Sequence, residues 1–203
     1  MKIIGIENNF IAAHNNATDK ALYITNQPIV FCKTDSALLK DQKPFFIPEW
    51  TQNCMAQINV VVRICRLGKY INKKFAHRYY DAMTLGIDFF AADLRQQQQL
   101  HGLPWEISKG FDGSAALGEW TGSEAIGEAE FCLQLDGKTV QKGNTADWIF
   151  HIDNLIEYLS QFYTLRQGDL IYTGCPCPPV TIHIGQRAEG YLNGVKRIAL
   201  NIK

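Results

Sequence analysis

An acidic and a basic residue in the middle of this 203-residue chain could act together in catalysis. Asp88 ends an apolar segment, and Lys109 precedes a glycine-rich turn at residues 110–113. A carboxylate and an ammonium group presented by loops with flexible backbone are a common active-site arrangement. An ordinary surface ion pair produces the same pattern, so residues elsewhere in the chain must decide between the two.

Longer motifs around these two residues resemble a known enzyme family. They are Asp88, the run Lys109-Gly110-Phe111-Asp112-Gly113, residues 143–147 (Gly-Asn-Thr-Ala-Asp) and residues 167–174 (Gln-Gly-Asp-Leu-Ile-Tyr-Thr-Gly). Together they resemble the fumarylacetoacetate hydrolase family, and the resemblance extends over nearly the whole chain. It implies a hydrolase of carbon–carbon bonds in acylpyruvates and related β-diketo acids, or a decarboxylase of oxaloacetate, and some members isomerise. It also implies a small keto-acid substrate, a mixed, rolled β-structure and a homodimer.

The resemblance further implies a divalent cation. Family members hold Mg²⁺ or Mn²⁺ as a Lewis acid that stabilises the negative charge developing as the bond breaks. The ligands are an Asp and a Glu-x-Glu pair, whose side chains face the same side of a strand. Here Asp88 matches the Asp, but Gln57 and Asn59 stand where the two glutamates are expected. Because hard cations prefer carboxylate ligands, we expect metal binding to be weak or absent.

Other functional positions of the family match only in part. His14 lies about one residue out of register with a family histidine that acts as general base, and Ala17 stands in place of its glutamate partner; a solvated loop histidine is the alternative. A family arginine is missing at Ala92. We expect Arg95, three residues later on the same helix face, to bind the substrate anion instead. Cys175 replaces the threonine of a Gly-Thr-Pro run that contacts substrate.

Three matched residues are expected in the substrate site by resemblance. Lys109 would contact the substrate carboxylate or oxyanion, and Asn144 and Thr145 would bind substrate. Each has a structural alternative. Lys109 could form an ion pair with Asp112 or Asp88, and the Asn144-Thr145 side chains could stabilise a turn.

Composition argues against several classes of function and partner. Twenty basic and twenty acidic residues cancel, so no overall field favours nucleic acid or an anionic membrane. No apolar stretch approaches the roughly 18 residues of a membrane span, and the first apolar run is too short for a signal sequence. A cytoplasmic protein is therefore expected. The six cysteines lack disulfide-framework spacing, and Cys175 and Cys177 are too close for a typical zinc pair, so free thiols are expected.

The elements that must position these residues are mostly strands. The chain is expected to form one domain over residues 1–203, of α+β or mostly β class, with two or three helices. Apolar alternation and β-branched runs predict strands over residues 2–6, 29–33, 59–65, 130–136, 138–142, 170–173, 180–184 and 197–202. Asp136-Gly137 and Asn193-Gly194 predict hairpin turns. Helical spacing predicts helices over residues 75–85, ending at Gly86, over 88–100 and over 152–163. By resemblance, Lys33 begins a loop beneath the active site.

Three interpretations of function remain open from the sequence. The first is an active hydrolase or decarboxylase with an altered site. The second is a non-catalytic family member that keeps the scaffold and binds at most a small carboxylate. The third is a metal-independent enzyme of changed reaction type, in which Lys109 or Cys175 carries the chemistry. Metal content and turnover distinguish them.

Overall fold

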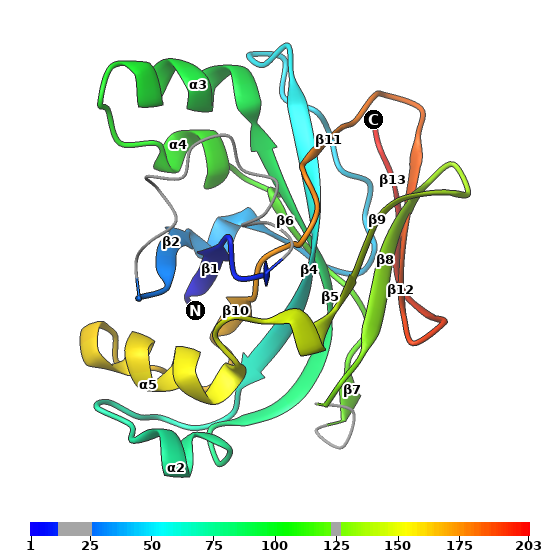
Figure 1. Cartoon of the computed structure of the whole chain (residues 1–203). Coiled ribbons are helices and arrows are strands. Elements are labelled where there is room, and N and C mark those ends of the chain that lie inside the picture. Colours follow the sequence, from blue (N-terminus) through cyan, green and yellow to red (C-terminus); the bar gives the residue numbers. More distant parts are fainter. Residues whose placement is uncertain (12–25, 123–126) are drawn as a thin grey trace.

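The computed structural model of the chain describes residues 1–11, 26–122 and 127–203, and it consists of two β-sheets with flanking helices (Figure 1). The larger sheet contains β1 (Ile3–Glu7), β2 (Ile29–Lys33), β3 (Leu38–Leu39), β4 (Cys54–Ile64), β5 (Tyr80–Ala91), β6 (Ala115–Leu117), β7 (Thr121–Gly122), β10 (Leu170–Tyr172) and β11 (Val180–Thr181). Its order is β2-β1-β10-β4-β5-β6-β3, with β11 beside β4 and β7 beside β5. The smaller sheet has the order β13-β12-β8-β9, from β8 (Glu130–Leu135), β9 (Lys138–Asn144), β12 (Arg187–Leu192) and β13 (Val195–Asn201). The expected mixed, rolled, mostly β class is confirmed.

Helices flank the larger sheet. They are α2 (Lys73–Ala76), α3 (Ala92–Leu100), α4 (Glu106–Lys109) and α5 (Ile152–Phe162), with 3₁₀ turns at Asp35–Ala37 and Thr145–Asp147. The described ranges thus contain four α-helices rather than two or three, because two of them are single turns of four residues. No helix in these ranges is long and apolar enough to cross a membrane.

The main hydrophobic core lies between the two sheets and beneath α5. Strands β4 and β5 pair antiparallel along almost their whole length. Alternate residues of β4, such as Ile58 and Val60, are completely buried in this core together with Leu85 and Ile87 of β5. Each such side chain stabilises the fold by about 1.5–3 kcal/mol on burial. This core fixes the two strands that carry the expected metal ligands.

The opposite face of the larger sheet carries polar residues. Since successive strand residues point to opposite faces, Gln57 and Asn59 of β4 face away from the main core. Asp88 of β5 is directly opposite Gln57 in the strand register. Lys33 at the end of β2 is also buried. Helices α3 and α4 cover this face (Figure 1), and α4 packs against both β5 and β2.

Two glycines make room for aromatic rings on this polar face. Gly5 of β1 is directly opposite Phe31 of β2, and a Cβ on Gly5 would overlap the Phe31 ring. A Cβ on Gly86 would lie 2.6 Å from the Tyr172 ring. The Tyr172 hydroxyl in turn donates a hydrogen bond to the Ala116 carbonyl at 2.9 Å. Both rings therefore approach the backbone closely enough to pack beside the buried charges.

The helix predicted over residues 75–85 is wrong. Helix α2 ends at Ala76, strand β5 begins at Tyr80, and Gly86 lies within that strand instead of capping a helix. From Ala82 onward every residue of β5 is buried. A strand buried on both faces lacks the polar alternation that identifies strands in a sequence. For the same reason the helix predicted over residues 88–100 begins only at Ala92.

Elements with a clear periodicity match their predictions. Helix α5 closely follows the predicted helix 152–163. The two predicted hairpin turns are present, with positive φ at both turn residues: 51° and 77° at Asp136-Gly137, and 48° and 76° at Asn193-Gly194.

Strand β12 was not predicted, and β4 begins five residues earlier than expected, at Cys54 rather than Asn59.

Candidate active site

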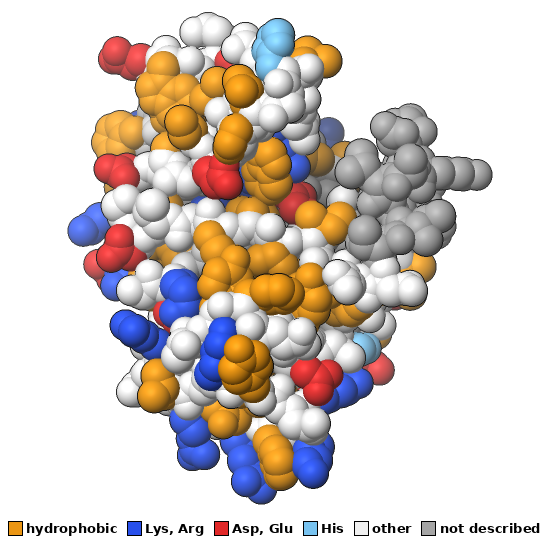
Figure 2. Space-filling view, turned by 90° about the vertical axis from the view of Figure 1, so that its left-hand side faces the viewer, with side chains coloured by type: hydrophobic (Ala, Val, Ile, Leu, Met, Phe, Trp, Pro, Cys, Tyr) orange, Lys and Arg blue, Asp and Glu red, His pale blue; other side chains and the backbone are white. Residues whose placement is uncertain are grey.

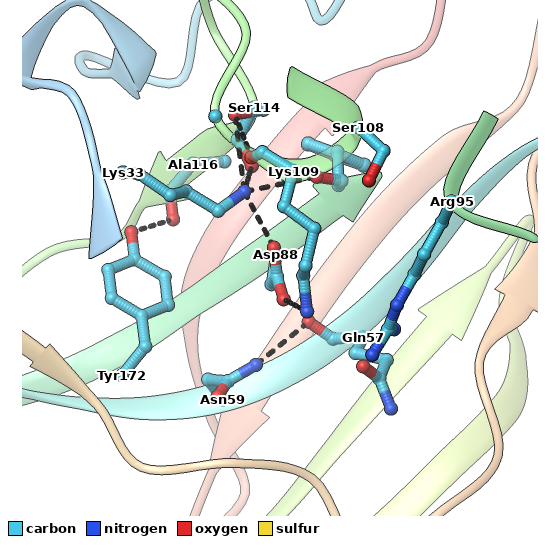
Figure 3. Close-up of polar contacts among 12 residues, drawn as sticks. Lys33, Gln57, Asn59, Asp88, Arg95, Ser108, Lys109, Ser114, Ala116 and Tyr172 are labelled. Carbon is cyan, nitrogen blue, oxygen red and sulfur yellow. Dashed lines mark hydrogen bonds and ion pairs between the residues drawn. The ribbon is translucent and has the colours of Figure 1, made fainter. Parts of the chain in front are cut away.

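Two carboxylates and three cations meet on the polar face of the larger sheet. Asp88 lies between two ammonium groups (Figure 3): Lys33 Nζ is 2.6 Å from Oδ1 and Lys109 Nζ is 2.9 Å from Oδ2. Lys109 also forms an ion pair with Glu7, and Arg95 Nη2 lies 3.3 Å from the same Glu7 oxygen. With all five groups ionised, three positive and two negative charges leave a net charge of +1.

Lys33 is held by the backbone as well as by charge. Its ammonium donates hydrogen bonds to the carbonyls of Phe89 at 3.0 Å and Ser114 at 2.7 Å, and to the Ser114 hydroxyl at 3.1 Å. These three bonds use all three ammonium protons. The ion pair with Asp88 at 2.6 Å is a fourth contact of the same ammonium.

Lys109 is enclosed by carboxylates and aromatic rings. It is 1% exposed, and its ammonium lies 4.0 Å from the centre of the Phe31 ring and 5.1 Å from that of Phe90. Ring faces attract cations at such distances. The Ser114 hydroxyl donates to the Lys109 carbonyl at 2.8 Å and so connects this residue to Lys33. Lys109 is thus fixed by charge, packing and backbone contacts.

Burial and charge act in opposite directions on these groups. Burial would raise the pKa of Asp88, but Lys109 and Lys33 outweigh it and hold that pKa below its usual value. Burial would likewise raise the pKa of Glu7, and Lys109 and Arg95 reverse the shift. Burial lowers the pKa of Lys33 to about 8, against the attraction of Asp88. Both carboxylates are therefore ionised at neutral pH, and Lys33 loses its proton in mildly alkaline solution.

A cleft of about 510 Å³ opens beside this cluster, lined by Glu7, Gln57, Arg95, Trp105 and Pro179 among others. The Arg95 guanidinium carbon lies 5.1 Å from the centre of the Trp105 ring, and its Nε has no hydrogen-bond partner among the described residues. Figure 2 shows the face of the molecule on which α3, α4 and α5 lie, with hydrophobic side chains gathered across its middle. Neither Asp88 nor Lys109 lines the cleft. Among the residues that the structure describes, Arg95 and Glu7 are the charged groups in the wall of this cleft.

The expected metal ligands are adjacent, but they do not fit a divalent cation. Each Asp88 oxygen faces an ammonium group. The Asn59 side-chain oxygen accepts a hydrogen bond from the Gly174 amide at 2.7 Å, and the Gln57 side chain donates to the Cys177 carbonyl at 3.4 Å. No group of three or more His, Cys, Asp or Glu residues in the described ranges could hold a metal. A cation there would compete with two ammonium groups for one carboxylate.

The other predicted site residues lie in different surroundings. His14 is outside the described residues. Asn144 accepts the Ala146 amide at 2.9 Å, which is the contact of a stabilised turn. The Thr145 hydroxyl instead donates to the Gly127 carbonyl at 2.8 Å and accepts the Ala129 amide at 2.8 Å, so it connects the turn to the segment before β8. Neither lines the cleft. Arg95 and Ala92 do line it together, as their spacing on one helix face predicted.

Cys175 is buried beside a second thiol. Burial raises its pKa well above the usual value. A hydrogen bond between the two thiols lowers the pKa of Cys177 to about 6, and the Lys142 amide donates to that sulfur at 3.4 Å. Cys177 is therefore the more reactive thiol of the pair.

Glu7 was not predicted to belong to the cluster, and no charged partner was predicted for Lys33. Glu7 and Lys109 are 102 residues apart in the chain. The available signal was an acidic residue at the end of a short apolar strand, where alternation places it on the face opposite Ile4 and Ile6. Only the strand pairing shows that Asp88 shares that face.

Comparison with known proteins identifies related chains. The model of the fumarylacetoacetate (FAA) hydrolase C-terminal family matches residues 2–202. A mitochondrial oxaloacetate decarboxylase of Dictyostelium discoideum is 32% identical over 198 residues, covering 96% of this chain and 89% of that protein. A mitochondrial oxaloacetate tautomerase of Caenorhabditis elegans is 30% identical, covering 88% and 87%. The crystal structure of Pseudomonas aeruginosa fumarylpyruvate hydrolase with Mn²⁺ and pyruvate has a TM-score of 0.88 and 27% identity, covering 100% of this chain and 89% of that one.

Proposed function

The chain belongs to the fumarylacetoacetate hydrolase family, and from this we propose that it cleaves a carbon–carbon bond beside the keto group of a small keto acid. The substrate class is acylpyruvates, related β-diketo acids or oxaloacetate. The observation that carries the proposal is the Arg95–Glu7 pair in the wall of the cleft, backed by the buried Lys109 and Lys33. The names of the relatives support an enzyme over a non-catalytic binding protein.

These substrates share one chemical problem. When water adds to the distal carbonyl of an acylpyruvate, the carbon–carbon bond breaks and its electron pair passes to the carbon beside the keto group. Loss of CO₂ from oxaloacetate leaves the electron pair on the same carbon. Both routes give the enolate of pyruvate, which then takes up a proton. A site for either reaction must bind a carboxylate and stabilise a developing oxyanion.

The cleft offers groups for both tasks. Arg95 can hold a carboxylate in a bidentate contact, and its guanidinium is fixed against Trp105 and Phe90. Glu7 is a carboxylate in the cleft wall and is the candidate proton acceptor. The net positive charge of the cluster favours an anionic substrate and the enolate formed from it.

The test is the loss of enol absorbance of an acylpyruvate, and of oxaloacetate in parallel, by the natural protein and by an Arg95→Ala variant. A lost charged contact corresponds to about 1.5–3 kcal/mol, so kcat/KM should fall roughly 10- to 150-fold. Arg63→Ala is the matched control, because Arg63 pairs with Asp81 at 2.9 Å and does not line the cleft. That control should retain full activity.

Two results would contradict the proposal. One is no turnover of any of these acids by the natural protein, with Mn²⁺ added or with a chelator. The other is an Arg95→Ala variant that turns them over like the control. The homodimer and the cytoplasmic location implied above remain part of the proposal, and sedimentation and cell fractionation test them.

A further inference from the structure

We propose that the Lys109 ammonium is the resident cation of this site and takes the charge-balancing position that the family resemblance assigns to a divalent metal. The inference goes beyond the proposed function, because it concerns which cation the two carboxylates bind and not which acid is cleaved. It rests on the contacts of Lys109, on the side chains around Asp88 and on the charge of the cluster.

The contacts of Lys109 resemble those of a bound ion. Its ammonium lies against Glu7 on one side and Asp88 on the other, and the Phe31 ring covers a third side. The side chain is 1% exposed and is absent from the cleft wall. A lysine that served mainly to bind substrate would present its ammonium to the cleft. Here Arg95 does so instead.

The residues that replace the family glutamates support this arrangement. Gln57 faces Asp88 across the β4–β5 pair at the position expected for a metal-binding carboxylate. As an amide it adds no charge, and Asn59 uses its oxygen to hold the Gly174 amide. Two negative charges remain, from Glu7 and Asp88, and three positive side chains already exceed them. A divalent cation would raise the net charge from +1 to +3.

The consequence for the reaction is that the protein's own cations balance the site. Lys109 and Lys33 hold the two carboxylates in place, and Arg95, which also contacts Glu7, is the cation in the described wall of the cleft. Glu7 is then a carboxylate oriented by Lys109 rather than a metal ligand. With this arrangement the cleft can bind an enolisable keto acid and needs no bound divalent ion.

The experiment is a titration with Mn²⁺, followed by the electron paramagnetic resonance signal of the free ion, on the natural protein and a Lys109→Met variant. We expect the natural protein to leave the signal unchanged up to roughly millimolar Mn²⁺, whereas sites built from several carboxylates bind far more tightly. Removing the ammonium exposes Glu7 and Asp88 to the ion, so Lys109→Met should bind Mn²⁺ at least about tenfold more tightly. Lys142→Met, at an exposed surface pair, is the control and should behave as the natural protein does.

Thermal unfolding provides a second readout. A ligand that binds only the folded state raises Tm. Saturating Mn²⁺ should therefore raise the Tm of Lys109→Met by about 5 °C and leave the Tm of the natural protein unchanged. Micromolar Mn²⁺ binding by the natural protein would overturn the proposal, even if the variant fails to fold. Equal affinity in the natural protein and a folded Lys109→Met would also overturn it. Neither readout depends on turnover, so this proposal can fail while the proposed function stands.

Discussion

Asp88→Asn is the substitution that most sharply tests the buried charge cluster. It preserves the shape of the side chain but removes the negative charge that lies 2.6 Å from Lys33 and 2.9 Å from Lys109. Lys109 keeps Glu7 as a partner, whereas Lys33 keeps only neutral hydrogen-bond acceptors. Removing one member of a buried ion pair costs about 3–5 kcal/mol. The variant should therefore lose that much of its unfolding free energy at pH 7.

The pH dependence of Asp88→Asn gives a second, independent expectation. The folded-state pKa of Lys33 is about 8, against 10.5 for an ordinary lysine, and losing Asp88 lowers it further. At pH values at which Lys33 is neutral in the folded protein but protonated in the unfolded chain, the unfolding free energy rises by about 1.4 kcal/mol per pH unit. In the natural protein this rise lies between about pH 8 and 10.5. In the variant it begins at lower pH, so between pH 7 and 8 the variant should gain about 1 kcal/mol more than the natural protein.

Urea unfolding followed by tryptophan fluorescence at pH 7 and pH 8 measures both effects. Asp81→Asn is the control, because its carboxylate is 44% exposed and paired with Arg63 at the surface. Such a pair contributes about 0–1 kcal/mol. The reasoning is refuted if Asp88→Asn is no less stable than Asp81→Asn at pH 7, or if the two variants respond equally to pH.

Three further predictions concern packing, acid stability and thiol reactivity. Gly5→Ala should cost about 1–3 kcal/mol in urea unfolding because its Cβ overlaps the Phe31 ring, whereas Gly127→Ala, with open space around it, should cost less. Because the pKa of Glu7 is lowered in the folded protein, its ionised carboxylate stabilises the fold above about pH 4, and this stability is lost as pH falls through the folded-state pKa. In Glu7→Gln the unfolding free energy, measured by urea unfolding, should therefore fall less steeply in acid than in the natural protein. Alkylation of Cys177 by iodoacetamide, followed by peptide mass spectrometry, should rise through about pH 6 and level off, which a midpoint near 8.5 would contradict.

The parts of the fold that were predictable are those with one buried face. Helix α5 buries an apolar stripe with helical spacing, and the β8–β9 hairpin alternates and turns at Asp136-Gly137. Strand β5 was mistaken for a helix because both of its faces are covered and every residue from Ala82 onward is buried. Burial of both faces removed the polar alternation that would have identified the strand carrying Asp88.

The candidate site was predictable only where residues follow a local pattern. The i, i+2 spacing of Gln57 and Asn59 placed both on one strand face, and Asp88 lies opposite them in the register. The partners of Lys109 were only partly predictable. Asp88 was one of two candidates, but Glu7 comes from a distant strand that the chain alone does not place beside it. Such contacts follow from strand order rather than from spacing.

The most direct test of the central claim is the turnover of an acylpyruvate and of oxaloacetate by protein from which metal has been removed, measured with excess chelator and again with added Mn²⁺. We predict the same kcat/KM in both conditions, because in the proposed site Lys109 balances the charges of Glu7 and Asp88 and Arg95 binds the substrate carboxylate. Turnover that disappears with chelator and returns with Mn²⁺ would contradict the account and assign the cation position to a metal.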